Sequence, residues 1–246
     1  PEGPAGRRTS SFSLIHFPED MTLPGKSFET DYDVLLAVTD GGWFEAGRLY
    51  GDWARAQPWA SAPPPGAQKG TREAREIQAW QLLQFPDKPA AQWASEMKEL
   101  ARRLDTRFGI HFYNWHQIPF DISYPDYFPA RPGFKAMVSK MKRAGFLTMP
   151  YINGRLWDIN ARSWPVTGAG RHAVKHSAER ATPLTLIQHL EDYGSGSKLA
   201  PMCPTTPFWR RTVVDLCTRI VKDLGCDGVY IDQVAAEKAE LCCDTR

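Results

Sequence analysis

The sequence predicts an α/β protein whose main part is the N-terminal part of a (β/α)8 TIM-type barrel. We expect about four β/α units, preceded by remnant strands of a β-sandwich. Strand-like and helix-like segments alternate from about residue 74 onward, which is typical of a parallel sheet with crossover helices. Long segments follow the second and third predicted strands, where barrels build active-site loops. A doubly wound sheet has the same alternation, but no glycine-rich phosphate loop follows the first strand.

Three regions are expected along the chain. Residues 1–42 hold two strand-like runs, 12–17 and 32–38, which we interpret as the end of a β-sandwich. Residues 43–73 combine an amphipathic helix with a proline-rich linker. Residues 74–246 form the partial barrel.

The partial barrel is expected to contain four strands and three helices. The strands are predicted at 77–84, 110–114, 147–152 and 228–231. The helices are predicted at 89–104, 133–144 and 207–224. Pro89 suits a first helical turn, and Gly145 suits a C-terminal cap. A long insertion, residues 153–206, follows the third strand, and we expect a short helix within it near 184–193.

Bulk properties exclude several classes of partner. The formal net charge is +2, which gives no electrostatic case for binding nucleic acid. No apolar run is long enough to span a membrane. The five cysteines are odd in number and contain no C-x-x-C pair, so neither a zinc site nor a disulfide framework is indicated. No cofactor and no metal ion is expected. The sequence leaves the cellular compartment open.

The candidate site residues lie where the four predicted strands end. The carboxyl ends of barrel strands meet on one face, so these side chains are expected to converge. Asp232, which ends the fourth strand, is the leading catalytic candidate, although a turn-capping role is the commoner one for such an aspartate. The other strand ends carry Trp80 or Gln84, then Tyr113, Asn114, Trp115 and His116, then Tyr151, Asn153, Arg155, Trp157 and Asp158, and finally Gln233.

These residue types together suit a sugar ligand. Carboxylate and amide side chains form hydrogen bonds with sugar hydroxyl groups, and indole rings stack on the apolar faces of sugar rings. Glycoside hydrolysis needs two carboxyl groups beside the scissile bond, and we expect Asp232 and Asp158 to supply them. The weaker acids are Asp121, Asp126, Glu237 and Glu240, and the last two are expected on a helix-like tail. The expected substrate-binding residues are Trp80, Trp115, His116, Tyr151, Asn153, Arg155, Trp157 and Gln233.

Several segments in order resemble a known family. They are 126–134, 149–158, 202–209 and 227–233, the last reading Asp-Gly-Val-Tyr-Ile-Asp-Gln. The sequence resembles an uncharacterised, mainly bacterial family of glycoside-hydrolase-like barrel proteins that carries a domain-of-unknown-function label. That family is similar to the α-glucosidase, α-galactosidase and endo-α-N-acetylgalactosaminidase superfamily. The resemblance implies a β-sandwich before the barrel and makes Asp232 the nucleophile.

The resemblance also implies what the chain lacks. In that superfamily the acid/base follows a later strand, so we expect it beyond Arg246 and expect the remainder of the barrel or another copy to be needed for stability. The favoured hypothesis is a retaining glycosidase. The alternatives are a non-catalytic carbohydrate-binding or scaffold fragment, and a different barrel enzyme that uses Asp232 and His116, with a metal ion as an option.

Overall fold

A computed structural model describes residues 11–16, 18, 24–60, 73–85, 88–177, 185–234, 236–237 and 240–244. The chain divides into two compact units, Pro1–Ala62 and Pro63–Arg246. The predicted linker after residue 60 lies largely outside the described residues. Each unit is considered by itself.

The first unit contains helix α1, Trp43–Arg55, and a short 3-10 helix η1, Pro58–Ala60. Helix α1 was predicted, and none of its residues is buried. The strands expected at 12–17 and 32–38 are wrong for every described residue in those runs. Alternating apolar residues predict a strand only where a second strand is available to pair, and Leu35 and Val38 are instead exposed.

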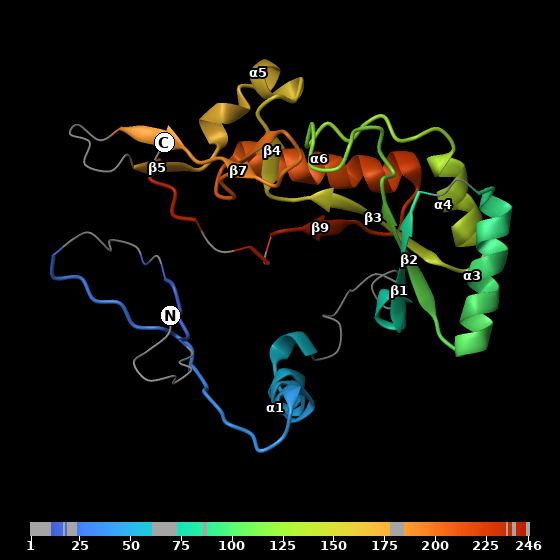
Figure 1. Cartoon of the computed structure of the whole chain (residues 1–246), viewed down its shortest axis with the longest axis horizontal. Helices are drawn as coiled ribbons and strands as arrows, with labels where there is room; N and C mark the ends of the chain where they lie inside the picture. Colours follow the sequence, from blue (N-terminus) through green and yellow to red (C-terminus); the bar gives the residue numbers. More distant parts are fainter. Residues whose placement is uncertain are drawn as a thin grey trace. The chain divides into compact units, whose positions relative to one another are not determined.

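The second unit is built on a parallel sheet with strand order β1-β2-β3-β9 (Figure 1). The strands are β1, Ala79–Gln84, β2, Phe108–Tyr113, β3, Leu147–Asn153, and β9, Tyr230–Asp232. All three strand pairs are parallel. Neighbours in the sheet are thus neighbours in the predicted β/α series, as the alternation of segments predicted.

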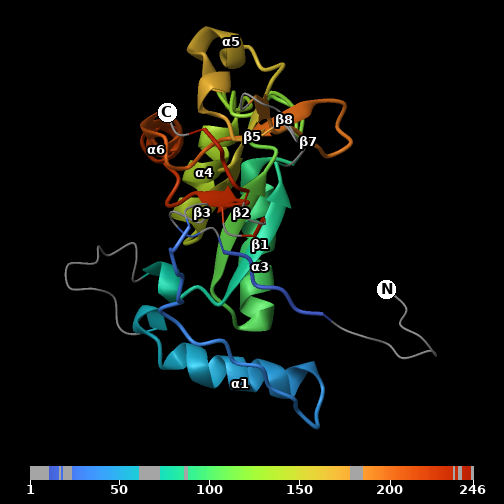
Figure 2. The same ribbon diagram turned by 90° about the vertical axis from the view of Figure 1, so that its left-hand side faces the viewer.

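Three helices connect these strands. They are α3, Ala90–Leu104, α4, Phe134–Arg143, and α6, Pro207–Leu224. Pro89 precedes the first turn of α3, and the Thr206 side chain caps α6 by accepting a hydrogen bond from the backbone N–H of Trp209. The ends of α6 are those predicted from sequence. Figure 2 shows α3 and α4 beside the sheet, with the inserted segment beyond the carboxyl end of β3.

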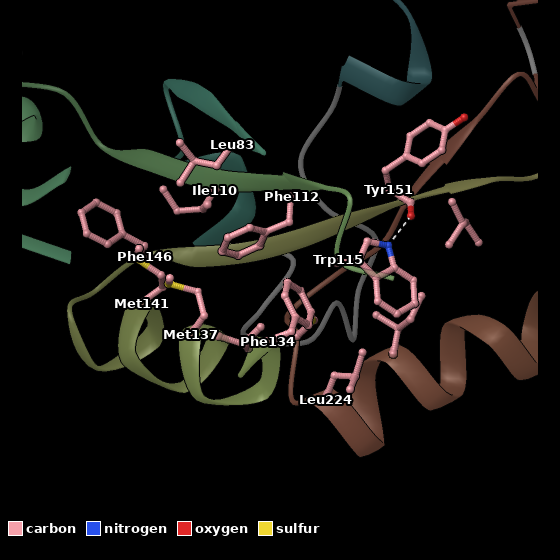
Figure 3. Close-up of a cluster of buried hydrophobic side chains, with 14 of the residues drawn as sticks. Leu83, Ile110, Phe112, Trp115, Phe134, Met137, Met141, Phe146, Tyr151 and Leu224 are labelled. Atoms are coloured by element: carbon pink, nitrogen blue, oxygen red, sulfur yellow. Dashed lines mark hydrogen bonds between the residues drawn. The ribbon is translucent and has the colours of Figure 1, made fainter. Parts of the chain in front are cut away.

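The main core fills the space between the sheet and these helices (Figure 3). Alternate strand residues face the helices, so Leu83, Ile110 and Phe112 are buried there. Met137 and Met141 of α4 and Leu224 of α6 meet them from the helix side. Side chains at the intervening strand positions point to the opposite face of the sheet, which carries the candidate site.

The insertion after β3 folds as two small antiparallel sheets. One joins β4, Leu156–Asp158, to β8, Lys198–Pro201, and β7, Glu191–Asp192. The other pairs β5, Lys175–Ser177, with β6, Leu186–Gln188. Helix α5, Ser163–Thr167, and the 3-10 helix η2, Ala169–His172, complete the segment. The helix expected near 184–193 is wrong, because two short stretches there, β6 and β7, are strands that pair with β5 and β8.

Candidate functional site

Asp232 ends β9 at the carboxyl edge of the sheet and is partly buried. Its Cα partner in the register is Asn153, the last residue of β3. The Tyr151 hydroxyl lies 3.2 Å from Oδ2, and the Tyr230 hydroxyl lies 3.5 Å from Oδ1. Both hydroxyls donate to the carboxylate, which orients it.

The aspartate that opens the Asp-Gly motif fixes where β9 begins. Asp227 Oδ2 accepts hydrogen bonds from the backbone N–H and hydroxyl of Thr148 at 2.9 and 3.0 Å. Its other oxygen forms an ion pair with Lys142 of α4 at 2.8 Å. Asp227 therefore ties β9 to β3 and α4, and the alignment of Asp232 with Asn153 follows from this anchoring.

Four rings form a closed set on the same face of the sheet, next to Asp232. The centroid distances are 5.0 Å for His111–Tyr113, 4.8 Å for Tyr113–Tyr151, 6.1 Å for Tyr151–Tyr230 and 4.5 Å for His111–Tyr230. Burial is the main cause that raises the pKa of Tyr113 and Tyr151. The negative charge of Asp232 raises both pKa values further, which shows that its field reaches these rings. Sequence reasoning missed His111 and Tyr230, although positions 109, 111 and 113 alternate toward this face.

The loop after β2 brings a second carboxyl group into the electrostatic field of Asp232. Burial raises the pKa of Asp121, a hydrogen bond with Tyr124 opposes this, and the charge of Asp232 raises it further. Asp121, Ser123 and Gln233 have left-handed backbone angles, with φ of 57°, 61° and 62°. Such conformations are costly outside glycine and often gather at functional sites.

A cavity of about 380 Å³ lies next to this strand end, and Gly154, Arg155 and Gln233 are among its lining residues. A side chain at Gly154 would overlap Ile231, with its Cβ 2.2 Å from Ile231 Cγ2, so only glycine lets the turn after β3 pass so close to β9. Of the predicted site residues, Asp232, Tyr151, Asn153, Arg155 and Gln233 thus gather at the ends of β3 and β9.

Arg155 is held by an acid that sequence reasoning missed. Its Nη1 and Nη2 donate to the two carboxylate oxygens of Glu191 at 2.8 and 2.5 Å. The Tyr193 hydroxyl also donates to Glu191, and Gln233 Nε2 donates to Tyr193 at 3.4 Å. Burial alone would raise the pKa of Glu191, but Arg155 and Tyr193 outweigh it and the pKa is lowered. Glu191 is 36 residues from Arg155, so no local pattern predicts the pair.

Asp158, the predicted second catalytic acid, is a buried anchor. Its side chain is fully enclosed and accepts from the backbone N–H of Ser123 at 2.7 Å and of Asn160 at 2.8 Å. The Ser197 hydroxyl also donates to it. These bonds tie the loop after β2 to the inserted sheet and leave no oxygen open to a substrate. Asp158 therefore has the contacts of a turn and loop anchor.

Trp80, predicted to bind substrate, lies away from the carboxyl edge. It is the second residue of β1, four residues before Gln84, which corresponds to about 13 Å along a strand. Its ring lies against Gly109, where an added Cβ would come within 2.3 Å of it. Trp80 therefore packs across the neighbouring strand, and Gln84 occupies the strand end instead.

Three further predicted binding residues are structural. Trp115 is fully buried and donates from Nε1 to the carbonyl oxygen of Tyr151 at 2.6 Å (Figure 3). His116 is fully buried, with Nδ1 2.8 Å from the carbonyl oxygen of Ile118. Trp157 packs in a second core with Trp209, and its Nε1 donates a hydrogen bond to the Ser163 hydroxyl. Residue type alone does not separate a core aromatic from one that faces a ligand.

The burial of His116 predicts a pH-dependent stability. Burial lowers the pKa of His116 to about 4, so it is neutral in the folded protein and protonates more readily when unfolded. Because the unfolded state binds more protons between pH 6.5 and 4, stability falls by about 3 kcal/mol as pH drops through this window. Urea unfolding at several pH values should show a flatter profile for His116→Gln. An equally steep profile in the variant would contradict this account.

Two kinds of feature are not found in the described part of the chain. No helix there combines the length and apolarity that a bilayer crossing requires. No group of three or more His, Cys, Asp and Glu side chains there has the arrangement of a metal site.

Comparisons with known proteins relate the chain to glycoside hydrolases. The family described as "Domain of unknown function (DUF6259)" matches residues 28–246. A Bacteroides thetaiotaomicron protein named "Putative glycoside hydrolase" is 29% identical over 88% of this chain and 31% of its own length. A similarly named Monosiga brevicollis protein is 27% identical over 92% of this chain and 21% of its own length. The chain therefore spans about a fifth to a third of these relatives.

Solved structures show a related fold. The α-N-acetylgalactosaminidase NagBb of Bifidobacterium bifidum, as a quadruple mutant, has a TM-score of 0.51 at 18% identity, over 81% of this chain and 35% of that chain. Its complex with GalNAc has a TM-score of 0.50 at 20% identity, over 71% and 31%. This likeness concerns the arrangement of the parallel sheet and its helices.

Proposed function

This chain belongs to the DUF6259 family, and we propose that it supplies the nucleophile side of the active site of a retaining glycoside hydrolase, with Asp232 as the nucleophile. Its parallel sheet is then part of a (β/α)8 barrel. The observation that carries the proposal is the carboxylate of Asp232, at the carboxyl end of β9 and oriented by the Tyr151 and Tyr230 hydroxyls. The glycosidase names of its relatives support the reaction class.

The reaction follows from this carboxylate. One oxygen of Asp232 attacks the anomeric carbon, the bond to the leaving oxygen breaks, and the leaving oxygen takes a proton from an acid. Water then attacks the glycosyl ester and restores the carboxylate. The Tyr151 and Tyr230 hydroxyls limit the rotation of the Asp232 carboxylate, which favours attack in one direction.

A second carboxyl group has to donate the proton, and Asp121 has the electrostatic property that this role needs. Its pKa is raised, so it holds its proton to higher pH than an exposed aspartate. If Asp121 is the donor, Asp121→Asn should slow the hydrolysis of alkyl glycosides by about 100-fold. The hydrolysis of nitrophenyl glycosides should slow much less, because nitrophenolate is a good leaving group and needs little protonation. Equal slowing of both substrates would place the donor elsewhere, as the superfamily resemblance implies.

A screen of nitrophenyl α-glycosides tests the function itself. Turnover of at least one α-glycoside with retention of configuration, followed by NMR of the first product anomer, is the expected result. Carbohydrate binding without turnover would favour the alternative, a non-catalytic carbohydrate-binding fragment. Turnover with inversion would overturn the nucleophile assignment.

A further inference from the structure

The cavity at the turn after β9, lined by Gln233 but not by Asp232, combines one cation, acids, an amide and apolar side chains. Among the described residues that line it, Arg155 is the only cation, while Glu237 and Glu240 carry carboxylates. Met202 and Trp209 contribute apolar wall. Its volume, about 380 Å³, falls within the range of small-molecule sites. An unopposed arginine in such a place would indicate a ligand with a carboxylate, sulfate or phosphate group.

We propose that this cavity is a subsite for a neutral sugar residue, and that Glu191 sets this specificity by neutralising Arg155. The inference rests on the proposed glycosidase function and adds the class of substrate. Glu191 is a specificity-determining residue that acts through Arg155, because it is not among the residues that line the cavity.

The Arg155–Glu191 pair is enclosed and held on several sides. The exposed fractions of the two side chains are only 13% and 16%, and the bond is bidentate. Tyr193 donates to Oε2 of Glu191 at 2.8 Å, and His189 Nε2 lies 3.4 Å from Oε1. An acidic ligand would have to displace Glu191 and leave that carboxylate enclosed without its partner, which is costly.

The remaining lining groups favour hydroxyl groups over anions. Glu237 and Glu240 repel an acidic ligand and accept hydrogen bonds from hydroxyls. The amide oxygen of Gln233 is enclosed and has no hydrogen-bond partner among the described residues, so it can accept from a ligand hydroxyl once its side chain turns toward the cavity. Met202 and Trp209 belong to the buried second core and form the apolar floor of the cavity. A neutral sugar avoids repulsion by the two carboxylates and leaves the Arg155–Glu191 pair in place.

The test measures glycan binding to the full chain carrying Asp232→Asn, so that glycans are not consumed. An array should pair neutral α-linked galactose- and glucose-terminated oligosaccharides with counterparts that carry a uronate or sulfate at the same position. We expect preference for the neutral member of a pair. Adding Glu191→Gln frees the guanidinium and should strengthen binding of the acidic member about tenfold or more. The control is Asp192→Asn, which removes the neighbouring exposed acid that pairs with Lys198. It should change the binding of neither the neutral nor the acidic glycans.

Two results would overturn the proposal. One is that the Asp232→Asn protein with Glu191 intact binds acidic glycans as tightly as, or more tightly than, their neutral counterparts. This result does not depend on whether the Glu191→Gln variant folds. The other is a folded Glu191→Gln protein, with an unchanged thermal midpoint, that gains no acidic binding. The catalytic role of Asp232 is tested by a different result. If the protein hydrolysed aryl glycosides but showed no preference in the array, the subsite proposal would be wrong and the role of Asp232 would stand.

Discussion

The Asp232→Asn variant is expected to lose glycosidase activity on the order of 10⁴-fold in kcat/KM while keeping its fold. The amide has the size of the carboxylate but is a far weaker nucleophile. It can still accept from the Tyr151 hydroxyl, which now lies 3.2 Å from Oδ2. Initial rates on the best α-glycoside from the screen, with circular dichroism as a check of folding, provide the measurement.

The matched control for Asp232→Asn is Asp223→Asn. Asp223 lies on α6 with 60% of its side chain exposed, and it pairs with Arg219 at 3.8 Å. The same chemical change at this position should leave turnover within about twofold, as is usual for exposed pairs. Similar rates for both variants would mean that Asp232 is not the nucleophile.

Trp115→Ala is expected to destabilise the second unit by about 3–5 kcal/mol. The side chain is fully buried against Phe134 and Tyr127, and its Nε1 donates to the carbonyl oxygen of Tyr151. Alanine leaves a cavity and removes the donor to that buried carbonyl. Urea unfolding followed by tryptophan fluorescence and circular dichroism measures the loss.

Trp43→Ala serves as the control, because Trp43 is 86% exposed on α1. It should change stability by less than about 0.5 kcal/mol. Trp115→Phe should give an intermediate loss, since the ring remains and the hydrogen bond is lost. If Trp115→Ala were as stable as Trp43→Ala but bound sugar more weakly, the sequence-based assignment of Trp115 to the substrate would be right after all.

Local patterns predicted the repeating part of the fold because its elements are long and periodic. Helix α6 has a threonine cap, a proline in its first turn and a glycine after its end, so its bounds follow from sequence. The strands of the insertion are two to four residues long and exist only because they pair with other segments, for example Leu156 with Pro201 and Leu186 with Ser177. Such short strands have no period of their own, which is why a helix was expected near 184–193.

The positions of several candidate site residues could be predicted from the sequence, but their contacts could not. Strand ends pointed to Asp232, Tyr151 and Asn153, because a parallel sheet brings its carboxyl ends together. The partners of each side chain were not predictable. Asp158 and Arg155 follow the same strand, yet Ser123 and Ser197 enclose the first, while Glu191 neutralises the second. These partners lie 35 to 39 residues away in the sequence, and their approach depends on the tertiary fold.

The most direct test of the central assignment is to trap the covalent intermediate. A fluorinated α-glycosyl fluoride of the preferred sugar should accumulate a glycosyl ester, because fluorine slows its hydrolysis more than its formation. Proteolysis and mass spectrometry should then find one added sugar on the peptide that contains Asp232, and none in Asp232→Asn. A label on Asp121 or another carboxyl group, with Asp232 unmodified, would contradict the account.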